Sequence, residues 1–166
     1  MMNLKTLHVK AIPSAMAKAE RYRLLNDAAA AESICHDILH VDPENQPALI
    51  MLILTLTDQF GSVGSSTVDR VREFLPRLKL DYQRYYYSGI ICERWAKAQL
   101  SRSYMGSSAV AFDWLRDAMD WFEKAEAICP AGEDESILRW NACLRSIIHF
   151  KLEAQNDPDH PPSFGE

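Results

Sequence analysis

The sequence predicts an all-α protein in which antiparallel helix pairs stack side by side. Residues 17–47 place apolar side chains at helical spacing, with a turn at Asn26-Asp27 and a stop at Asp42-Pro43. One pair of short amphipathic helices cannot cover its own apolar faces, so neighbouring pairs must cover them. The chain has 166 residues, of which 48% are apolar, and these values favour a single folded domain.

The first helix pair follows an N-terminal lead-in, residues 1–12, whose few apolar side chains either pack or stay loose. Pro13 suits the first turn of helix one, because the N–H that proline lacks would have no partner there. This helix is expected to end near Leu25, where Asn and Asp supply a turn and the next cap. Helix two then runs to about Val41.

Helix three is expected from Pro47 to about Phe60, and its sequence is apolar on nearly every side. Such a helix belongs in the middle of a stack, where its neighbours cover all of its faces. Gly and Ser dominate residues 61–66, and this composition predicts a loop.

Ser66 and Asp69 have the spacing of a capping box and predict the start of helix four. The expected end of this helix is near Lys79, although Pro76 lies inside the segment. Proline removes a helical hydrogen bond and clashes with the preceding turn, so it should kink or shorten the helix.

Helix five is a long helical stretch from Asp81 to about Met105. Gly89 shares one side of it with bulkier residues, which predicts a point of close packing against a neighbouring helix. Glycine costs about 1 kcal/mol of helix propensity relative to alanine, and a tight contact offsets that cost.

Helix six is expected from about Val110 to Ile128, and Asp134 is the expected cap of helix seven. The chain would then form three helix pairs and a final capping helix, about seven helices in all. A capping helix needs a polar outer face. The basic residues available for that face are Arg139, Arg145 and Lys151.

The folded domain is expected to span residues 13–154. Residues 155–166 are polar and rich in proline, and this composition predicts a disordered tail.

Small residues, an aromatic residue and a proline recur in one order in two parts of the chain. The members are Ala19, Tyr22, Ala31 and Pro43, and later Ala118, Phe122, Ala125 and Pro130. Their spacing resembles the tetratricopeptide repeat family, although Cys35 occupies the place of the usual second aromatic residue. The segments LTDQF, YYSGIICERWAKAQL and ESILRWNACLR are also similar to a group of bacterial repeat proteins without an assigned activity.

The resemblance implies a right-handed stack of helix pairs whose first helices line a concave, peptide-binding groove. The residues projected onto this groove are Met16, Glu20, Arg23, Ile50, Leu54, Thr57, Tyr86, Ile90, Glu93, Arg94 and Lys97. Such a lining suits a peptide held by apolar contacts and oriented by Arg94 and Lys97. Some members of the family grip a C-terminal carboxylate with lysine and asparagine, but here Met16 and Glu20 occupy the corresponding places.

Composition excludes some classes of partner and favours a cytoplasmic protein. The net charge of −5 gives no general reason to bind nucleic acid. The longest apolar run, residues 48–54, is too short to span a membrane, and residues 1–13 lack the features of a secretory signal. The four cysteines contain no CxxC pair and are expected to be buried free thiols in a reducing compartment.

Two motifs could hold a metal ion or a phosphate group. His36 and His40 lie one helical turn apart, a spacing at which two imidazoles can bind a divalent metal such as zinc. A third ligand is missing from the motif, so we favour a solvated helix face and expect no metal or cofactor. Residues 61–67, GSVGSST, lack the preceding strand and the lysine of a phosphate-binding loop.

Four tyrosines cluster near the start of helix five, beside basic residues. They are Tyr82, Tyr85, Tyr86 and Tyr87. A helix cannot turn four such rings into the core, so at least one is expected to be exposed. Either two rings pack in the core and the others scatter over the surface, or the cluster binds a partner.

Charge is distributed unevenly along the chain. Residues 69–102 hold eight basic and four acidic residues, a net charge of +4. Residues 111–135 hold two basic and eight acidic residues, a net charge of −6. The two blocks lie in adjacent helices, which predicts ion pairing between them. The alternative is a basic strip that attracts an acidic peptide or nucleic acid.

The sequence spacing assembles no Ser/His/Asp or Cys/His arrangement, so we expect no catalytic activity. The favoured hypothesis is a protein- or peptide-binding adaptor or scaffold. A structural protein that self-associates into a homo-oligomer is the alternative, and a metal-dependent enzyme is a distant third.

Overall fold

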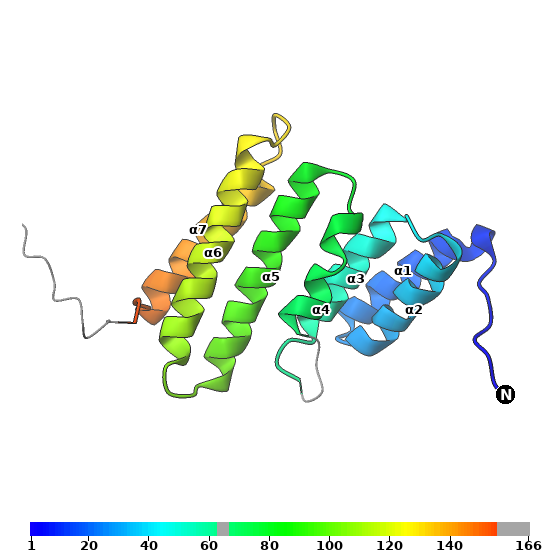
Figure 1. Cartoon of the computed structure of the whole chain (residues 1–166), viewed down its shortest axis with the longest axis horizontal. Coiled ribbons are helices and arrows are strands. Elements are labelled where there is room, and N and C mark those ends of the chain that lie inside the picture. The colour runs from blue at the N-terminus through cyan, green and yellow to red at the C-terminus, as the bar shows by residue number, and fades with distance from the viewer. Residues whose placement is uncertain (63–66, 156–166) are drawn as a thin grey trace, which may run out of the picture.

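The computed structural model describes residues 1–62 and 67–155, and these ranges contain seven α-helices, two 3₁₀-helices and no strand. The α-helices are α1 Ile12–Leu24, α2 Ala28–Val41, α3 Gln46–Asp58, α4 Val68–Arg72, α5 Asp81–Arg102, α6 Ser107–Ala127 and α7 Glu135–Phe150. The 3₁₀-helices are η1 Val9–Ala11 and η2 Leu75–Arg77. Figure 1 shows the helices side by side in an extended row, with the N-terminus at one end and α7 at the other.

The predicted all-α class is confirmed. The tail predicted to be disordered is residues 155–166. All of these residues except Gln155 lie outside the described ranges. In the lead-in, Leu7 packs against the core whereas Leu4 is exposed, and α1 begins directly after η1. None of the described helices combines the length and the apolar composition needed to cross a bilayer.

Short polar side chains begin α2 and α3. Asn26 adopts a left-handed conformation with a φ of 60°, and the Asp27 carboxylate then accepts a hydrogen bond from the Ala30 N–H at 3.1 Å. Asn45 caps α3 in the same way, since its side-chain oxygen accepts from the Ala48 N–H at 3.0 Å. The predicted turn at Asn26 and cap at Asp27 are confirmed, and they fold α2 back onto α1.

α4 is short and ends earlier than expected. The Thr67 hydroxyl caps it by accepting from the Arg70 N–H at 3.3 Å, while Ser66 of the predicted capping box lies outside the described residues. The predicted continuation to Lys79 is wrong, because a proline ring clashes with the carbonyl four residues before it. For Pro76 that residue is Arg72, where α4 ends, and the chain continues as η2.

The connection between α5 and α6 lies about three residues earlier than the sequence suggests, since α5 ends at Arg102 and α6 begins at Ser107. Ser103 and Gly106 both adopt left-handed conformations, with φ values of 48° and 85°. Gly106 therefore forms the cap alone, and the two serines after it belong to α6.

Gly89 lies where α5 and α6 approach each other closely, as predicted. A Cβ atom at this position would lie 2.5 Å from Cε1 of Phe122, whose side chain is fully buried. The missing side chain lets the Phe122 ring rest directly on α5. The contact between α5 and α6 is the most extensive of the described helix contacts.

Two groups of buried side chains form the core, one in each half of the row. The first group comes from α1, α2, α3 and α4 together with Leu78 and Ile91, and the second from α5, α6 and α7 together with Leu152. Tyr87 and Trp114 pack against both groups, so the two halves share one continuous core. α3 contacts α1, α2, α4 and α5, which agrees with its predicted place in the middle.

Ala19 and Ala31 are fully buried and bring α1 and α2 close together, while Tyr22 of the same sequence pattern is 40% exposed. The outer face of α7 is polar only in part. Arg145 and Lys151 are exposed, as expected for that face, but Leu138 and Ile148 are also 59% and 67% exposed, and no described helix follows α7 in the row.

Candidate functional site

A row of charged side chains crosses the face formed by α1, α3, α5 and α7. Asp58, the last residue of α3, accepts from Arg23 of α1, with 2.5 Å between Nε and Oδ2. It also accepts from Arg94 of α5, with 2.5 Å between Nη1 and Oδ1. Arg94 donates in addition to the Thr57 hydroxyl at 2.8 Å. Asp58 therefore ties together three helices that are distant in sequence.

Glu93 forms a second bridge in this row. Its carboxylate is only 2% exposed, and the same Oε1 atom lies 2.8 Å from Lys97 Nζ and 3.5 Å from Arg139 Nη1 of α7. A buried carboxylate needs such partners, because an uncompensated charge in the interior is costly. The side chains of Lys97 and Arg139 themselves remain 53% and 37% exposed, so both are accessible from solvent.

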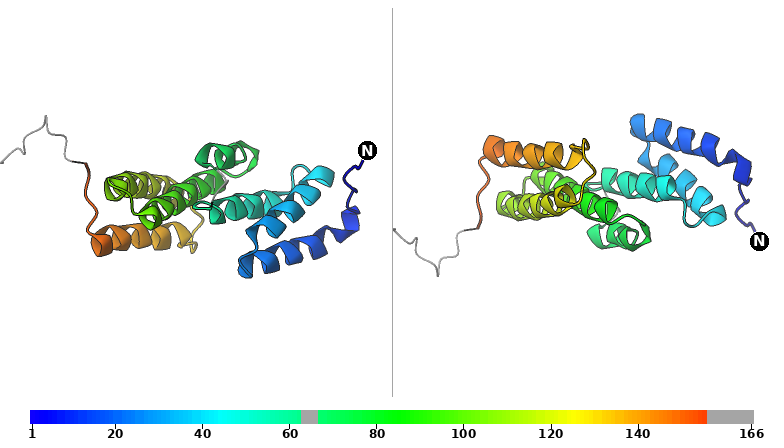
Figure 2. Two further views of the ribbon diagram at one scale, coloured as in Figure 1. Left: turned by 90° about the horizontal axis from the view of Figure 1, so that it is seen from below. Right: turned by 90° about the horizontal axis from the view of Figure 1, so that it is seen from above.

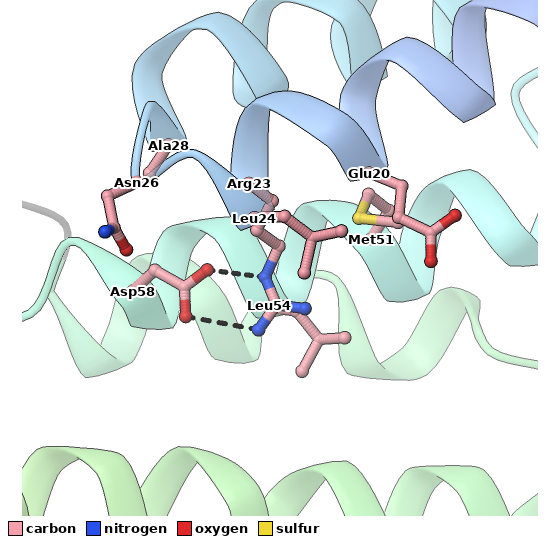
Figure 3. A pocket seen from close by; sticks show the side chains of 8 residues that line it. All are labelled: Glu20, Arg23, Leu24, Asn26, Ala28, Met51, Leu54 and Asp58. Carbon is pink, nitrogen blue, oxygen red and sulfur yellow. Dashed lines mark hydrogen bonds and ion pairs between the residues drawn. The ribbon is translucent and has the colours of Figure 1, made fainter.

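A hollow of about 600 Å³ lies between α1 and α3 (Figure 3). Four apolar side chains line it: Leu24, Ala28, Met51 and Leu54. Arg23 and Asp58 meet at one end of this hollow in Figure 3, while Glu20 lies at the other end. Its volume is within the range of about 300–1,000 Å³ that is usual for ligand sites.

A second hollow, of about 330 Å³, lies beside α5 and is polar. Its polar lining includes Thr57, Arg94, Lys97, Ser101 and Arg139. Asp58 lines both hollows, so they are adjacent and together form a surface that leads from the side chains of Leu24, Met51 and Leu54 to a cationic part. We call this surface, made by the two hollows together, the groove.

The guanidinium groups of the groove lie close enough to affect one another. Burial lowers the pKa of Arg94, the Asp58 carboxylate opposes this shift, and the charges of Arg23 and Arg139 lower the pKa further. Four cations, with Lys97 as the fourth, thus share the two bridging carboxylates. The row carries two more positive than negative charges.

The residues projected onto the groove from sequence fall into three sets. Glu20, Arg23 and Leu54 line the first hollow, and Thr57, Arg94 and Lys97 line the second. Met16, Ile50 and Tyr86 are half-buried and pack against the core. Ile90 and Glu93 are only 1% exposed, so their expected exposure in the groove is wrong. Ile90 packs among the side chains of α6, and Glu93 lies beneath Lys97 and Arg139.

The sequence reasoning missed Asp58 and Arg139. Asp58 lies one turn after Leu54, so the helical spacing that selected Leu54 also points to it. Arg139 was assigned to a solvent-facing surface of helix seven, but it turns towards Glu93 of α5. Its helix, α7, comes after the three predicted helix pairs. It therefore stands where the first helix of a fourth pair would stand, and the first helices of the pairs are the ones predicted to line the groove.

The tyrosine cluster is part of the packed structure, and all four rings are partly buried. Tyr85 stacks on Trp121 with ring centroids 5.9 Å apart, and Tyr86 packs against Phe122 at 5.8 Å. The expectation of an exposed ring is wrong, because aromatic side chains of α6 cover this part of α5. Tyr86 lines neither hollow of the groove, and its substitution would disturb the core.

The expected ion pairing between residues 69–102 and 111–135 is also wrong. In the described parts of the chain, ion pairs of the first block reach Glu32, Glu44, Asp58 and Arg139 or stay within the block. They therefore join the block to preceding helices and to α7, and not to α6, whose acidic side chains are exposed.

The two histidines proposed as possible metal ligands are both exposed. His36 Nε2 lies 3.5 Å from the Glu32 carboxylate, and the same carboxylate pairs with Arg70 at 2.6 Å. The described residues contain no group of three or more His, Cys, Asp or Glu side chains that could hold a metal ion.

All four thiols are free, and three of them are buried. Burial raises the pKa of Cys35 and Cys143 to about 12 and that of Cys92 to about 11. These three thiols are therefore protonated at neutral pH, whereas nucleophilic cysteines act as thiolates.

No family model, curated protein or solved structure matches this chain.

Proposed function

We propose that the protein is a non-catalytic adaptor that binds a peptide segment of another protein in the groove. The observation that carries this proposal is the joint lining of the groove by α1, α3, α5 and α7, with an apolar hollow next to a cationic one. Peptide-binding surfaces commonly combine apolar anchoring sites with a few orienting charges. The buried, protonated thiols and the tightly paired carboxylates Asp58 and Glu93 support binding over catalysis.

The proposal includes a tetratricopeptide-like arrangement of the helices. The pairs would be α1 with α2, α3 with the shortened α4, and α5 with α6, and α7 would cap the row. Two observations support it: consecutive helices pack on one another, and Figure 2 places α1 and α7 on one side of the row and α4 on the other. We further propose a bacterial cytoplasmic setting, which suits four free thiols.

Replacement of Leu24 by glutamine is expected to weaken partner binding by about tenfold or more, because a leucine covered by a ligand contributes roughly 1.5–3 kcal/mol. Leu24 is 78% exposed and lines the apolar hollow, so its loss should leave the fold intact. Leu25 provides a matched control, since it is 68% exposed but does not line the hollow.

The measurement is capture of partners from host lysate by the full chain, read by mass spectrometry, followed by affinity titration. Partners held by wild type and Leu25→Gln but lost with Leu24→Gln would support the adaptor. Equal capture by the two variants would exclude this groove as the binding surface.

Self-association is the second candidate function, and the outer face of α7 favours it. Leu138 and Ile148 are each exposed by more than half of their surface on α7, with the exposed Arg145 between them in the sequence, and Phe150 is exposed on another side of the helix. Exposed apolar side chains on the end helix of a row are available for contact with another protein molecule. Two copies could cover these residues by packing α7 against α7.

The double substitution Leu138→Glu and Ile148→Glu is expected to convert such a dimer into a monomer. Light scattering over a range of protein concentrations measures the change in mass. Leu80 is the matched control, because it is 57% exposed, close to the 59% of Leu138, but lies outside α7. A wild-type protein that stays monomeric at high concentration would exclude this second function.

A further inference from the structure

We infer that the ligand of the groove is an acidic peptide segment that carries an apolar side chain next to its carboxylates. This inference rests on the proposed adaptor function and specifies the chemistry of its partner. The apolar side chain would occupy the hollow between α1 and α3, and the carboxylates would contact the cations beside α5.

The first step concerns unused donors on the cationic side. Arg139 has five N–H donors, of which the described structure uses some for the 3.5 Å approach to Glu93 and for the Tyr86 hydroxyl. Lys97 uses its ammonium group for the same carboxylate and is still 53% exposed. Glu135, one turn before Arg139, makes no ion pair with it among the described residues. These donors are positioned by α5 and α7 and remain accessible to a second carboxylate.

The second step concerns charge balance. Asp58 is shared by Arg23 and Arg94, and Glu93 by Lys97 and Arg139, so each bridging carboxylate leaves one positive charge uncompensated. Two additional carboxylates would neutralise the row. Charge-assisted hydrogen bonds from Arg to carboxylate are among the stronger polar contacts and fix orientation as well as affinity.

The third step concerns the apolar hollow and the direction of the ligand. The hollows share Asp58, so one peptide can reach both. Glu20 lies at the far end of the apolar hollow from Asp58 and makes no ion pair among the described residues. The groove thus runs from a negative end to a positive end, and the acidic residues of the ligand lie towards α5. The apolar lining favours a peptide over a nucleic acid strand, whose backbone offers no aliphatic side chain for the hollow formed by Leu24, Met51 and Leu54.

The test uses the full chain and an array of short peptides, each made in two forms. One form contains Asp and Glu, and the other replaces every Asp and Glu by Asn and Gln. For the peptides that bind, we expect the acidic form to bind at least about tenfold more tightly, and added salt to reduce the difference. A single-stranded oligonucleotide of similar length is included as a competing probe.

Lys97→Gln tests the cationic side of the groove. The amide can still donate to Glu93, so the fold is retained, but the positive charge is lost. We expect the preference for acidic over amide peptides to fall several-fold in Lys97→Gln and to return in Lys97→Arg. Lys124→Gln on α6 is the control, because Lys124 is also exposed but lies outside the groove, and it should leave the preference unchanged.

The outcomes separate this inference from the proposed function. If both peptide forms bind equally well and Leu24→Gln weakens both, the adaptor function stands and the acidic ligand is wrong. If neither form binds more tightly to wild type than to Leu24→Gln, both proposals are overturned. Tighter binding of the oligonucleotide than of every acidic peptide would also overturn the acidic peptide ligand.

Discussion

A rise in pH from about 9 to about 11 is expected to remove most of the free energy of unfolding, because three buried thiols hold their protons only in the folded state. The thiols are Cys35, Cys92 and Cys143, all of which are fully buried in the core. Deprotonation of any of them inside the protein would place a charge among apolar side chains.

The direction of the effect follows from the two pKa values of each thiol. In the folded protein, burial raises the pKa to about 12 for Cys35 and Cys143 and about 11 for Cys92. In the unfolded chain, a cysteine thiol titrates near about 8.5. Between these values the unfolded state binds fewer protons than the folded state, so stability falls as the pH rises. Below the lower value both states are protonated and the contribution is fully present.

The size of the effect follows from the number of thiols. Each contributes a loss of roughly 1.4 kcal/mol per pH unit within its window, so three together lose roughly 4 kcal/mol per unit. Burial also raises the pKa of Tyr87 to about 12, which adds a further loss above about pH 10, where an unfolded tyrosine titrates. A domain of this size has a total stability of about 5–15 kcal/mol, so a loss of roughly 8 kcal/mol over two pH units removes more than half of it.

Urea unfolding followed by circular dichroism at a series of alkaline pH values measures this slope. Cys35→Ala is the informative variant, and its slope should be smaller by roughly one third in the window where all three thiols titrate. Loss of the sulfur atom also leaves a small cavity, but a cavity lowers stability equally at every pH and does not change the slope. An unchanged slope in Cys35→Ala would show that this thiol is not responsible.

Local features of the fold could be predicted from sequence where a few adjacent residues determine them. Asn26 and Asp27 form the predicted turn and cap, because left-handed backbone and N-capping are properties of short polar side chains. Gly89 is a packing point because no other residue type permits so close an approach. Pro76 shortens helix four as expected, although its effect extends back four residues, to Arg72.

Features that depend on the relative placement of distant helices could not be predicted. The burial of Ile90 depends on how α6 lies across α5, and helical periodicity does not report this. Arg139 pairs with the Glu93 carboxylate, which is 46 residues away in the sequence. The sequence of α7 alone therefore predicts that Arg139 faces solvent. The helices predicted to line the groove, helices one, three and five, do line the two hollows, but the bridging role of Asp58 and the contribution of α7 required the three-dimensional arrangement.

The largest effect expected from one added methyl group is at Gly89, where Gly89→Ala should lower the free energy of unfolding by about 2 kcal/mol. The new Cβ would lie 2.5–2.8 Å from three atoms of the Phe122 ring, closer than van der Waals contact allows. The ring is fully buried and rigid, so it cannot move aside without disturbing the second core group. Such overpacking costs about 3 kcal/mol, of which the better helix propensity of alanine returns about 1 kcal/mol.

The melting temperature of Gly89→Ala should therefore fall by about 4–8 °C, since each kcal/mol shifts it by about 2–4 °C in a domain of this size. The double variant with Phe122→Leu separates the clash from any other cause. Leucine lacks the ring atoms that meet the new Cβ, so in the Phe122→Leu background the change Gly89→Ala should be neutral or stabilising by up to about 1 kcal/mol.

The sign of the Gly89→Ala effect thus reverses with the residue at position 122, and this reversal is the decisive readout. A loss of the same size in both backgrounds would place the cause in the backbone of α5 and not in the contact with Phe122. Ser101→Ala on the exposed side of α5 provides the reference for a helix substitution without a packing contact and should change stability by less than about 0.5 kcal/mol. Because Tyr86 also packs against Phe122, with ring centroids 5.8 Å apart, a confirmed clash would show that this part of α5 is held in place by its contact with α6.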